Sequence, residues 1–152
     1  AEELSQRHFR LVCQLLEEYR VGPMPGLEEA LDALRRRGIP FGVVSSSWRW
    51  YVERCLRELG MYEDAAVIVT GSDGLPLKPA PAPYQAAARV FRPAPPGAVL
   101  AVEDSGSGVR SAVAAGLACA AVYNPDSGAQ DLSPARWRLN SLYELPALLD
   151  GN

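Results

Sequence analysis

The sequence predicts an α/β fold in which a parallel sheet carries helices on both faces. Short apolar runs alternate with segments of helical periodicity along the chain, and this alternation indicates parallel strands joined by right-handed crossovers. The run over residues 98–102 is apolar at every position, which is typical of a strand buried on both faces. In such a sheet the carboxyl ends of the strands lie along one edge, where ligands bind.

The first half of the chain is predicted to form three helices and two strands. A helix over residues 2–19 has an apolar stripe, and the Pro- and Gly-rich segment that follows it is typical of a hinge or domain crossing. The next helix starts at Leu27 and ends at Gly38, where glycine suits a left-handed cap. A strand over 39–44, a helix over 48–59 and a strand over 65–69 complete this half.

The second half repeats the alternation. The pattern predicts a helix opened by a proline over 83–91, a strand over 98–102, a helix over 107–116, a strand over 119–123, a short strand over 136–139 and a closing helix over 141–149. The proline-rich residues 93–97 are a short rigid connector rather than a domain linker. With 152 residues in all, one domain with a proper core is expected.

Composition excludes several classes of function. A net charge of −3 gives no electrostatic reason to bind nucleic acid or an anionic membrane. No apolar run approaches the roughly 20 residues of a membrane span, and no signal-peptide core opens the sequence. Three dispersed cysteines within apolar patterns are typical of reduced core residues, so we expect a cytoplasmic protein. The single histidine, His8, leaves no Ser-His relay unless another chain supplies a partner.

Two adjacent carboxylates, Glu103 and Asp104, follow the apolar run 98–102 and precede a Gly/Ser-rich turn. Placing two carboxylates at the end of a buried strand is costly, and a divalent cation with oxygen ligands, often shared with a phosphate, is the usual compensation. Alternatively, Asp104 or Ser105 only caps the following helix. Two further features favour the cation site.

The first feature is Lys78, the single lysine among 15 basic residues. It stands in a proline-rich loop and suggests a site that needs a compact charge rather than a planar guanidinium. The second is the strand that ends in Ser45, Ser46 and Ser47, although serines there can also be simple helix caps. Gathered at one sheet edge, Ser45 and Ser46 as donors, Lys78 as the cation and a Mg²⁺ ion held by Asp104, with help from Glu103, would bind a phosphate group.

Three segments resemble the second, third and fourth motifs of the haloacid dehalogenase-like hydrolases. They are Val43-Val44-Ser45-Ser46-Ser47, Lys78-Pro79-Ala80-Pro81 and Val102-Glu103-Asp104-Ser105-Gly106-Ser107-Gly108-Val109. The closest branch is that of β-phosphoglucomutase and the sugar-phosphate phosphatases. The resemblance implies a Rossmann-like α/β core, Mg²⁺ as cofactor, and a phosphatase or phosphomutase that acts on small phosphorylated metabolites through an aspartyl-phosphate. On this basis Lys78 and Ser45 are the candidate catalytic residues of this chain, and Asp104 and Glu103 the candidate metal ligands.

The resemblance also implies a division of the chain and a substrate-facing loop. Residues 1–20 resemble the last helix of a helical cap, and residues 21–152 resemble the α/β core without its first strand. Ser46, Ser47 and Arg49 are expected to bind phosphate or substrate, with Arg49 meeting a second anionic group and Trp48 stacking on a sugar or an aromatic leaving group. For Trp48 and Arg49 the alternative is a role in packing and in solvation, respectively.

Two departures from the family pattern affect these expectations. The family's first motif, Asp-x-Asp-Gly-Thr, carries the nucleophile and does not occur in this sequence. We therefore expect the position of the central strand, between the strands ending at Ser45 and Glu103, to be filled by an upstream segment, by a partner chain or by a rearranged pairing of these two strands. Without the nucleophile, this chain alone is predicted to be inactive. Ala82 stands where the family usually has an acidic residue, so the next helix must begin on Pro83 without a polar cap.

Two other readings of the same residues are possible. A non-catalytic phosphate-binding or interaction module that has lost the first motif would retain the remaining three motifs. A dinucleotide fingerprint starting at Gly106 fits poorly, because Ser111 stands at the third glycine position and two acids precede the turn where a pyrophosphate would lie.

Overall fold

The computed structural model of the chain describes residues 11–18 and 22–151. Residues 11–18 are helical; the remainder of the helix predicted over 2–19, and His8 within it, lie outside the described residues. The assignment of residues 1–20 to a helical cap therefore stays a prediction. No helix in the described ranges has the length and apolar character needed to cross a bilayer.

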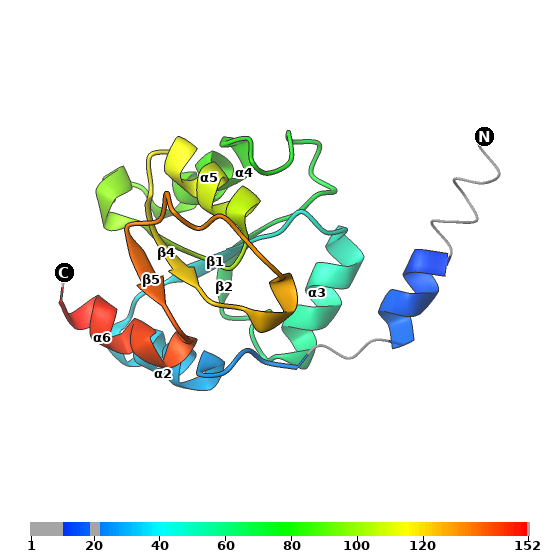
Figure 1. Cartoon of the computed structure of the whole chain (residues 1–152), viewed down its shortest axis with the longest axis horizontal. Helices are drawn as coiled ribbons and strands as arrows, with labels where there is room; N and C mark the ends of the chain where they lie inside the picture. Colours follow the sequence, from blue (N-terminus) through cyan, green and yellow to red (C-terminus); the bar gives the residue numbers. More distant parts are fainter. Residues whose placement is uncertain (1–10, 19–21, 152) are drawn as a thin grey trace.

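Helices and strands alternate along the rest of the chain (Figure 1). They are α2 (Leu27–Arg37), β1 (Phe41–Val44), α3 (Arg49–Glu58), β2 (Ala65–Val69), α4 (Ala82–Ala88), η1 (Arg89–Phe91), η2 (Pro96–Ala98), β3 (Leu100–Glu103), α5 (Gly106–Ala114), β4 (Ala118–Val122), η3 (Pro125–Ser127), β5 (Trp137–Leu139), η4 (Leu142–Glu144) and α6 (Leu145–Asp150). This order confirms the predicted α/β fold.

The strands are parallel, but they form two sheets instead of one. β1 pairs with β2, and β4 lies between β3 and β5. Among the described strands, β1 and β3 each have one neighbour, so each has an edge with unpaired backbone N–H and C=O groups. These two strands end at Val44 and Glu103 and flank the position where the sequence predicts a missing central strand. A rearranged pairing of β1 with β3 does not occur.

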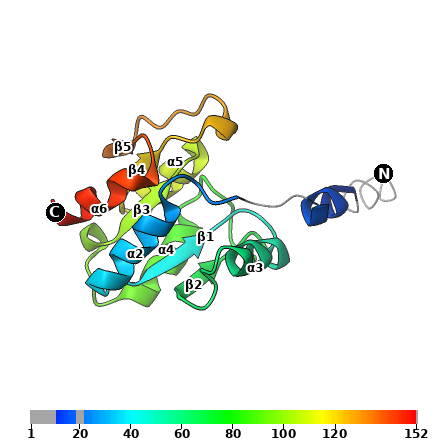
Figure 2. The same cartoon turned by 90° about the horizontal axis from the view of Figure 1, so that it is seen from below.

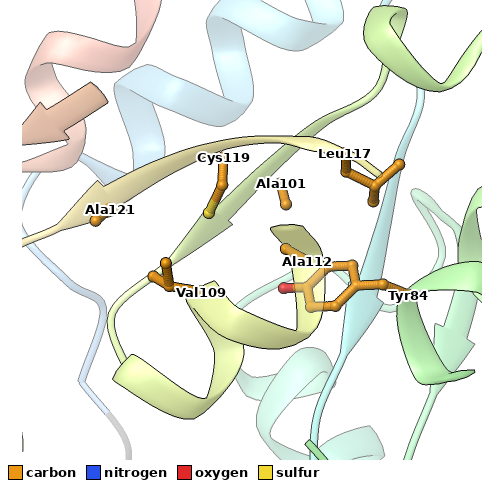
Figure 3. Packing of buried hydrophobic residues seen from close by; sticks show 7 residues of the cluster. All are labelled: Tyr84, Ala101, Val109, Ala112, Leu117, Cys119 and Ala121. Carbon is orange, nitrogen blue, oxygen red and sulfur yellow. The ribbon is translucent and has the colours of Figure 1, made fainter. Parts of the chain in front are cut away.

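Helices cover both faces of the sheet formed by β3, β4 and β5. Alternate residues of β4 pack on the two opposite faces of the sheet, as the pleat of a strand requires. On one face, α4 and α5 pack on the sheet (Figure 3) through Tyr84, Ala101, Val109, Ala112, Leu117, Cys119 and Ala121. On the other, α2 and α6 lie side by side (Figure 2), and the buried cluster contains Ala30, Ala120, Val122, Leu139, Leu142 and Leu145.

The apolar run before Glu103 is less buried than its composition predicts. The strand begins at Leu100 rather than at residue 98, because Pro96–Ala98 forms a 3₁₀ turn. Ala101 is buried, but Val102 is 37% exposed. The open edge of β3 explains this exposure, since no described strand lies beside Val102 on the β1 side.

The other helix and strand boundaries differ from the predicted ones by a few residues, for local reasons. β1 starts at Phe41, directly after Pro40, which has no N–H to donate to a ladder. α4 begins at Ala82 with Pro81 as its N-cap and no side-chain cap, as the alanine at position 82 predicted. Gly26 starts α2 with a φ of 86°, and a Cβ there would overlap the backbone of Leu142 and Tyr143, so glycine allows α2 to approach η4 closely.

Candidate functional site

A cavity of about 440 Å³ lies between the carboxyl ends of β1 and β3. Its polar part is formed by residues that follow or end these strands and by the lysine loop: Ser45, Ser46, Lys78, Glu103, Asp104, Ser105 and Ser107. Its apolar part is formed by Met24, Val44, Val102, Val122 and Leu142. The fold therefore brings together Ser45, Ser46, Lys78, Glu103 and Asp104 as the sequence predicts.

Lys78 connects β1 and β3, the two strands on either side of the gap that the predicted central strand would fill. Its ammonium group donates a hydrogen bond of 2.9 Å to the carbonyl oxygen of Val44, the last residue of β1, and forms an ion pair with Oε1 of Glu103, the last residue of β3. Both side chains are less than 10% exposed. An ammonium has three N–H donors, so these two contacts leave one donor for a ligand in the cavity.

The Lys78 loop is fixed by helix α5. The Ser111 hydroxyl, which is completely buried, donates a 2.6 Å hydrogen bond to the carbonyl oxygen of Ala80. This contact holds the loop two residues after Lys78. The loop is thus anchored although Ala82 provides no polar cap for α4.

The Glu103 carboxylate is tightly packed and is hydrogen-bonded to three side chains. Besides Lys78, its Oε1 accepts a 2.5 Å hydrogen bond from the Tyr84 hydroxyl, and its Oε2 accepts one of 3.2 Å from Ser105 Oγ. A Cβ at Gly108 would overlap this carboxylate. Because its oxygens are engaged with protein donors, the geometry supports a role for Glu103 in holding Lys78; direct metal ligation by Glu103 stays a prediction.

In the described part of the chain, only one of the two carboxylate oxygens of Asp104 accepts hydrogen bonds. Its Oδ2 accepts hydrogen bonds from Asn124 Nδ2 at 2.7 Å and from Ser127 Oγ at 3.1 Å. Within the described residues its Oδ1 makes no hydrogen bond, and Asp104 lines the cavity. Of the two residues that could cap the following helix, Ser105 does so: its Oγ accepts from the N–H of Gly108 at 3.1 Å.

The loop after β1 separates the remaining candidates. Ser45 and Ser46 line the cavity, while Ser47 does not; the N–H of Ser47 donates to Ser45 Oγ at 3.1 Å. Arg49 lies at the start of α3, and its Nη2 donates to both oxygens of Asp73 at 2.8 and 2.9 Å. This side chain is 41% exposed, and it joins α3 to the turn after β2. Substrate binding by Ser47 and Arg49 stays a prediction.

The residues at the cavity fit Mg²⁺ in the chemistry of their donors. Mg²⁺ prefers oxygen ligands, keeps several waters and is usually bound through one or two carboxylates plus phosphate. Asp104 offers such a carboxylate at a cavity that Ser107 also lines. In the described ranges, no three or more His, Cys, Asp and Glu side chains are grouped to hold a metal ion, so waters and phosphate oxygens would supply most of the ligands.

Four functional side chains were missed by sequence reasoning. Tyr84 lies on α4 and Ser111 on α5, and Asn124 and Ser127 lie in the 3₁₀ turn η3 and its cap. They contact the predicted residues over separations of 19 to 31 positions, which no local pattern reveals. The one available signal was a tyrosine six residues after Lys78 at the start of an otherwise alanine-rich helix.

Comparison with known proteins identifies the family of the chain. Residues 2–116 match the family described as haloacid dehalogenase-like hydrolase. The protein YhcW of Bacillus subtilis is 34% identical over 151 residues, which cover 98% of this chain and 67% of YhcW. A phosphoglycolate phosphatase of Xylella fastidiosa is 31% identical over 147 residues, covering 97% of this chain and 61% of that protein.

Solved structures show the same fold. CbbY from Rhodobacter sphaeroides, in complex with phosphate, superposes with a TM-score of 0.77 at 30% identity, covering 87% of this chain and 60% of CbbY. The same figures hold for a CbbY mutant in complex with xylulose 1,5-bisphosphate. The chain thus spans about three fifths to two thirds of the length of these relatives. From its motifs, fold and relatives, the chain belongs to the haloacid dehalogenase-like hydrolases, in the branch that contains phosphatases and β-phosphoglucomutases.

Proposed function

We propose that this chain forms the greater part of a Mg²⁺-dependent phosphatase or phosphomutase for a small phosphorylated metabolite. A carboxylate supplied on an additional strand would attack phosphorus and form an aspartyl-phosphate while the ester P–O bond breaks. Residues of this chain would bind the phosphoryl group during that exchange. The relatives support the substrate class, since a CbbY mutant forms a complex with xylulose 1,5-bisphosphate and another relative is a phosphoglycolate phosphatase.

One observation carries this proposal. The ammonium group of Lys78 contacts the last residues of both strands that flank the gap, at a cavity that Ser45, Ser46 and Asp104 also line. A fixed cation with hydroxyl and amide donors stabilises the negative charge of a transferring phosphoryl group. Ser45 and Ser46 would donate to its oxygens, and Lys78 would use its remaining donor.

Mg²⁺ would be held by Asp104, with Glu103 at most an outer contact. When bound, the ion would neutralise charge on the phosphate oxygens. The protein's own part is to orient the Asp104 carboxylate, which the hydrogen bonds from Asn124 and Ser127 to Oδ2 accomplish.

The additional strand would lie between β1 and β3. Each of these strands has an unpaired edge among the described strands, and an unsatisfied buried backbone group costs about 1–3 kcal/mol. A segment of polypeptide outside this sequence or a partner chain would pair with both edges and fill the apolar part of the cavity. Its carboxyl end would then reach the ammonium group of Lys78.

A complementation assay tests the proposal. The 152-residue chain is mixed with Mg²⁺ and a synthetic peptide in which Asp-x-Asp-Gly-Thr follows five β-branched residues. Phosphate release is measured from p-nitrophenyl phosphate, phosphoglycolate and a sugar bisphosphate. We expect no turnover by the chain alone, because it lacks the nucleophile, and turnover when the peptide is present.

Two controls make this assay specific. Replacing the first aspartate of the peptide by asparagine, or Lys78→Ala in the chain, should abolish release. Turnover by the chain alone that Lys78→Ala abolishes would contradict the proposal. Peptide and phosphate binding without turnover would instead favour a non-catalytic phosphate-binding module.

A further inference from the structure

Tyr84 contacts both members of the ion pair at the cavity. It lies in the first turn of α4, is 7% exposed, and packs in the cluster between α4, α5 and the sheet (Figure 3). Its hydroxyl donates to Glu103 Oε1 at 2.5 Å, and the Nζ atom of Lys78 lies 5.1 Å from the centre of its ring. Among the described residues, Tyr84 is the one side chain that both donates to Glu103 and places its ring beside Lys78.

The hydroxyl of Tyr84 donates to the same oxygen that Lys78 contacts. Oε1 of Glu103 accepts from both side chains. Tyr84 therefore fixes the position of the oxygen to which the Lys78 ammonium group is bound.

The contacts of Glu103 define the direction of the Lys78 ammonium. Ser105 holds Oε2, whereas Tyr84 and Lys78 share Oε1. If the Tyr84 hydroxyl were removed, the carboxylate could turn about its terminal torsion, which has a broad energy minimum. The ammonium group would follow it, because Lys78 has four rotatable bonds and Val44 fixes only one of its donors.

We propose that Tyr84 is a positioning residue, which through Glu103 fixes the Lys78 ammonium group at the end of the gap between β1 and β3. This proposal rests on the proposed function in so far as Lys78 is expected to meet a phosphate. The inference gives a role to the one hydroxyl-bearing side chain among the buried residues of this cluster.

The single lysine provides a direct measurement. Protein labelled with ¹³C,¹⁵N-lysine gives signals from Lys78 alone. In the wild-type chain, we expect two resolved Hε resonances and a high order parameter at Cε. In Tyr84→Phe, we expect these resonances to merge and the order parameter to fall, and the dissociation constant for inorganic phosphate to rise about tenfold.

Two matched variants separate positioning from general stability. Tyr123→Phe removes a hydroxyl from a tyrosine that is 61% exposed and should change neither readout. Leu117→Val, in the same buried cluster as Tyr84, should lower the melting temperature without loosening Lys78. If Tyr84→Phe does not fold, the wild-type protein decides: the Tyr84 hydroxyl proton should exchange slowly and show an Overhauser effect to the Lys78 side chain.

The outcomes distinguish this proposal from the proposed function. Unchanged order of Lys78 in folded Tyr84→Phe, or a rapidly exchanging hydroxyl proton in the wild type, overturns the role of Tyr84. Loosening of Lys78 with unchanged phosphate affinity supports the role of Tyr84 and contradicts phosphate binding by Lys78. Loosening together with weaker phosphate binding supports both.

Discussion

Because Gly108 has no side chain, it leaves room for the Glu103 carboxylate. The Glu103 carboxylate occupies the space where a Cβ at this position would lie, and it is held there by Lys78, Tyr84 and Ser105. The carboxylate cannot move aside without breaking these bonds. A glycine within a helix lowers stability by about 0.5–1 kcal/mol relative to alanine. At position 108 this loss is offset by the room that glycine leaves for the Glu103 carboxylate.

Gly108→Ala should therefore destabilise the protein, although alanine is the better helix former. Displacing Glu103 would leave Lys78 buried beside a broken pair, and such losses cost about 3–5 kcal/mol. We expect the free energy of unfolding, measured in urea, to fall by about 2 kcal/mol or more. Gly97→Ala is the matched control, because nothing lies within 4 Å of a Cβ there; an equal effect of both substitutions would refute the explanation.

Asn124 is expected to influence metal affinity without contacting the metal. It orients Asp104 through Oδ2, and loss of a side chain that orients a metal ligand typically costs about 10–100-fold in affinity. Titration of the chain with MgCl₂, followed by NMR chemical shifts, should show affinity about tenfold weaker in Asn124→Ala. Asn140→Ala, whose side chain bonds to Glu144, should behave as the wild type. Binding that Asp104→Ala leaves unchanged would exclude Asp104 as the ligand.

At the scale of elements, the ion pair between Arg49 and Asp73 links α3 to the turn after β2, beside a hydrogen bond from the N–H of Arg49 to Ser72 Oγ. Arg49 bonds to Asp73, and Asp73 also accepts from the N–H and the hydroxyl of Thr70 at 2.9 and 3.1 Å. Burial alone would raise the pKa of Asp73, but the hydrogen bonds from Arg49 and Thr70 outweigh it and lower the pKa. These contacts hold the helix that follows the serine loop.

This lowered pKa makes the attachment dependent on pH. A carboxylate with a lowered folded-state pKa contributes stability above its unfolded pKa of about 3.9, and the contribution disappears as the pH falls through the folded-state pKa. Wild-type protein should therefore be more stable than Asp73→Asn at pH 7, by about 1 kcal/mol, and the difference should shrink below about pH 4. Asp126→Asn, at an exposed position of η3, is the control. A difference that persists at low pH would contradict this role.

The sequence predicted the elements and the polar end of the cavity better than it predicted the supporting contacts. Ser45, Lys78 and Asp104 could be placed together because parallel strands and their loops share one edge. Tyr84 and Asn124 could not, since their partners depend on how α4 and the loop after β4 pack on the sheet. The partial exposure of Val102 was also missed, because an apolar run indicates a buried strand whether or not a neighbour is present.

At the scale of the whole molecule, the division of the strands into two sheets is the dominant feature. Both buried clusters are centred on β4, and neither contains a residue of β1, β2 or α3. Val44 packs on one cluster from the side, and α4 contacts β1 and β2. The β1–β2–α3 part is joined to the rest through α4, through the bonds of Lys78, and through the ion pair between Arg35 of α2 and Asp64, which precedes β2.

This division has a consequence for how the molecule opens. Proteins open locally in cooperative units, and units with few buried apolar contacts open at lower free energy than the whole. Native-state hydrogen exchange should therefore show two thresholds: amides of β1 and β2 should exchange by a partial opening, and those of β4 only on global unfolding. Binding of a strand between β1 and β3 would merge the two thresholds into one. A single threshold in the chain by itself would mean that the two sheets already open as one cooperative unit.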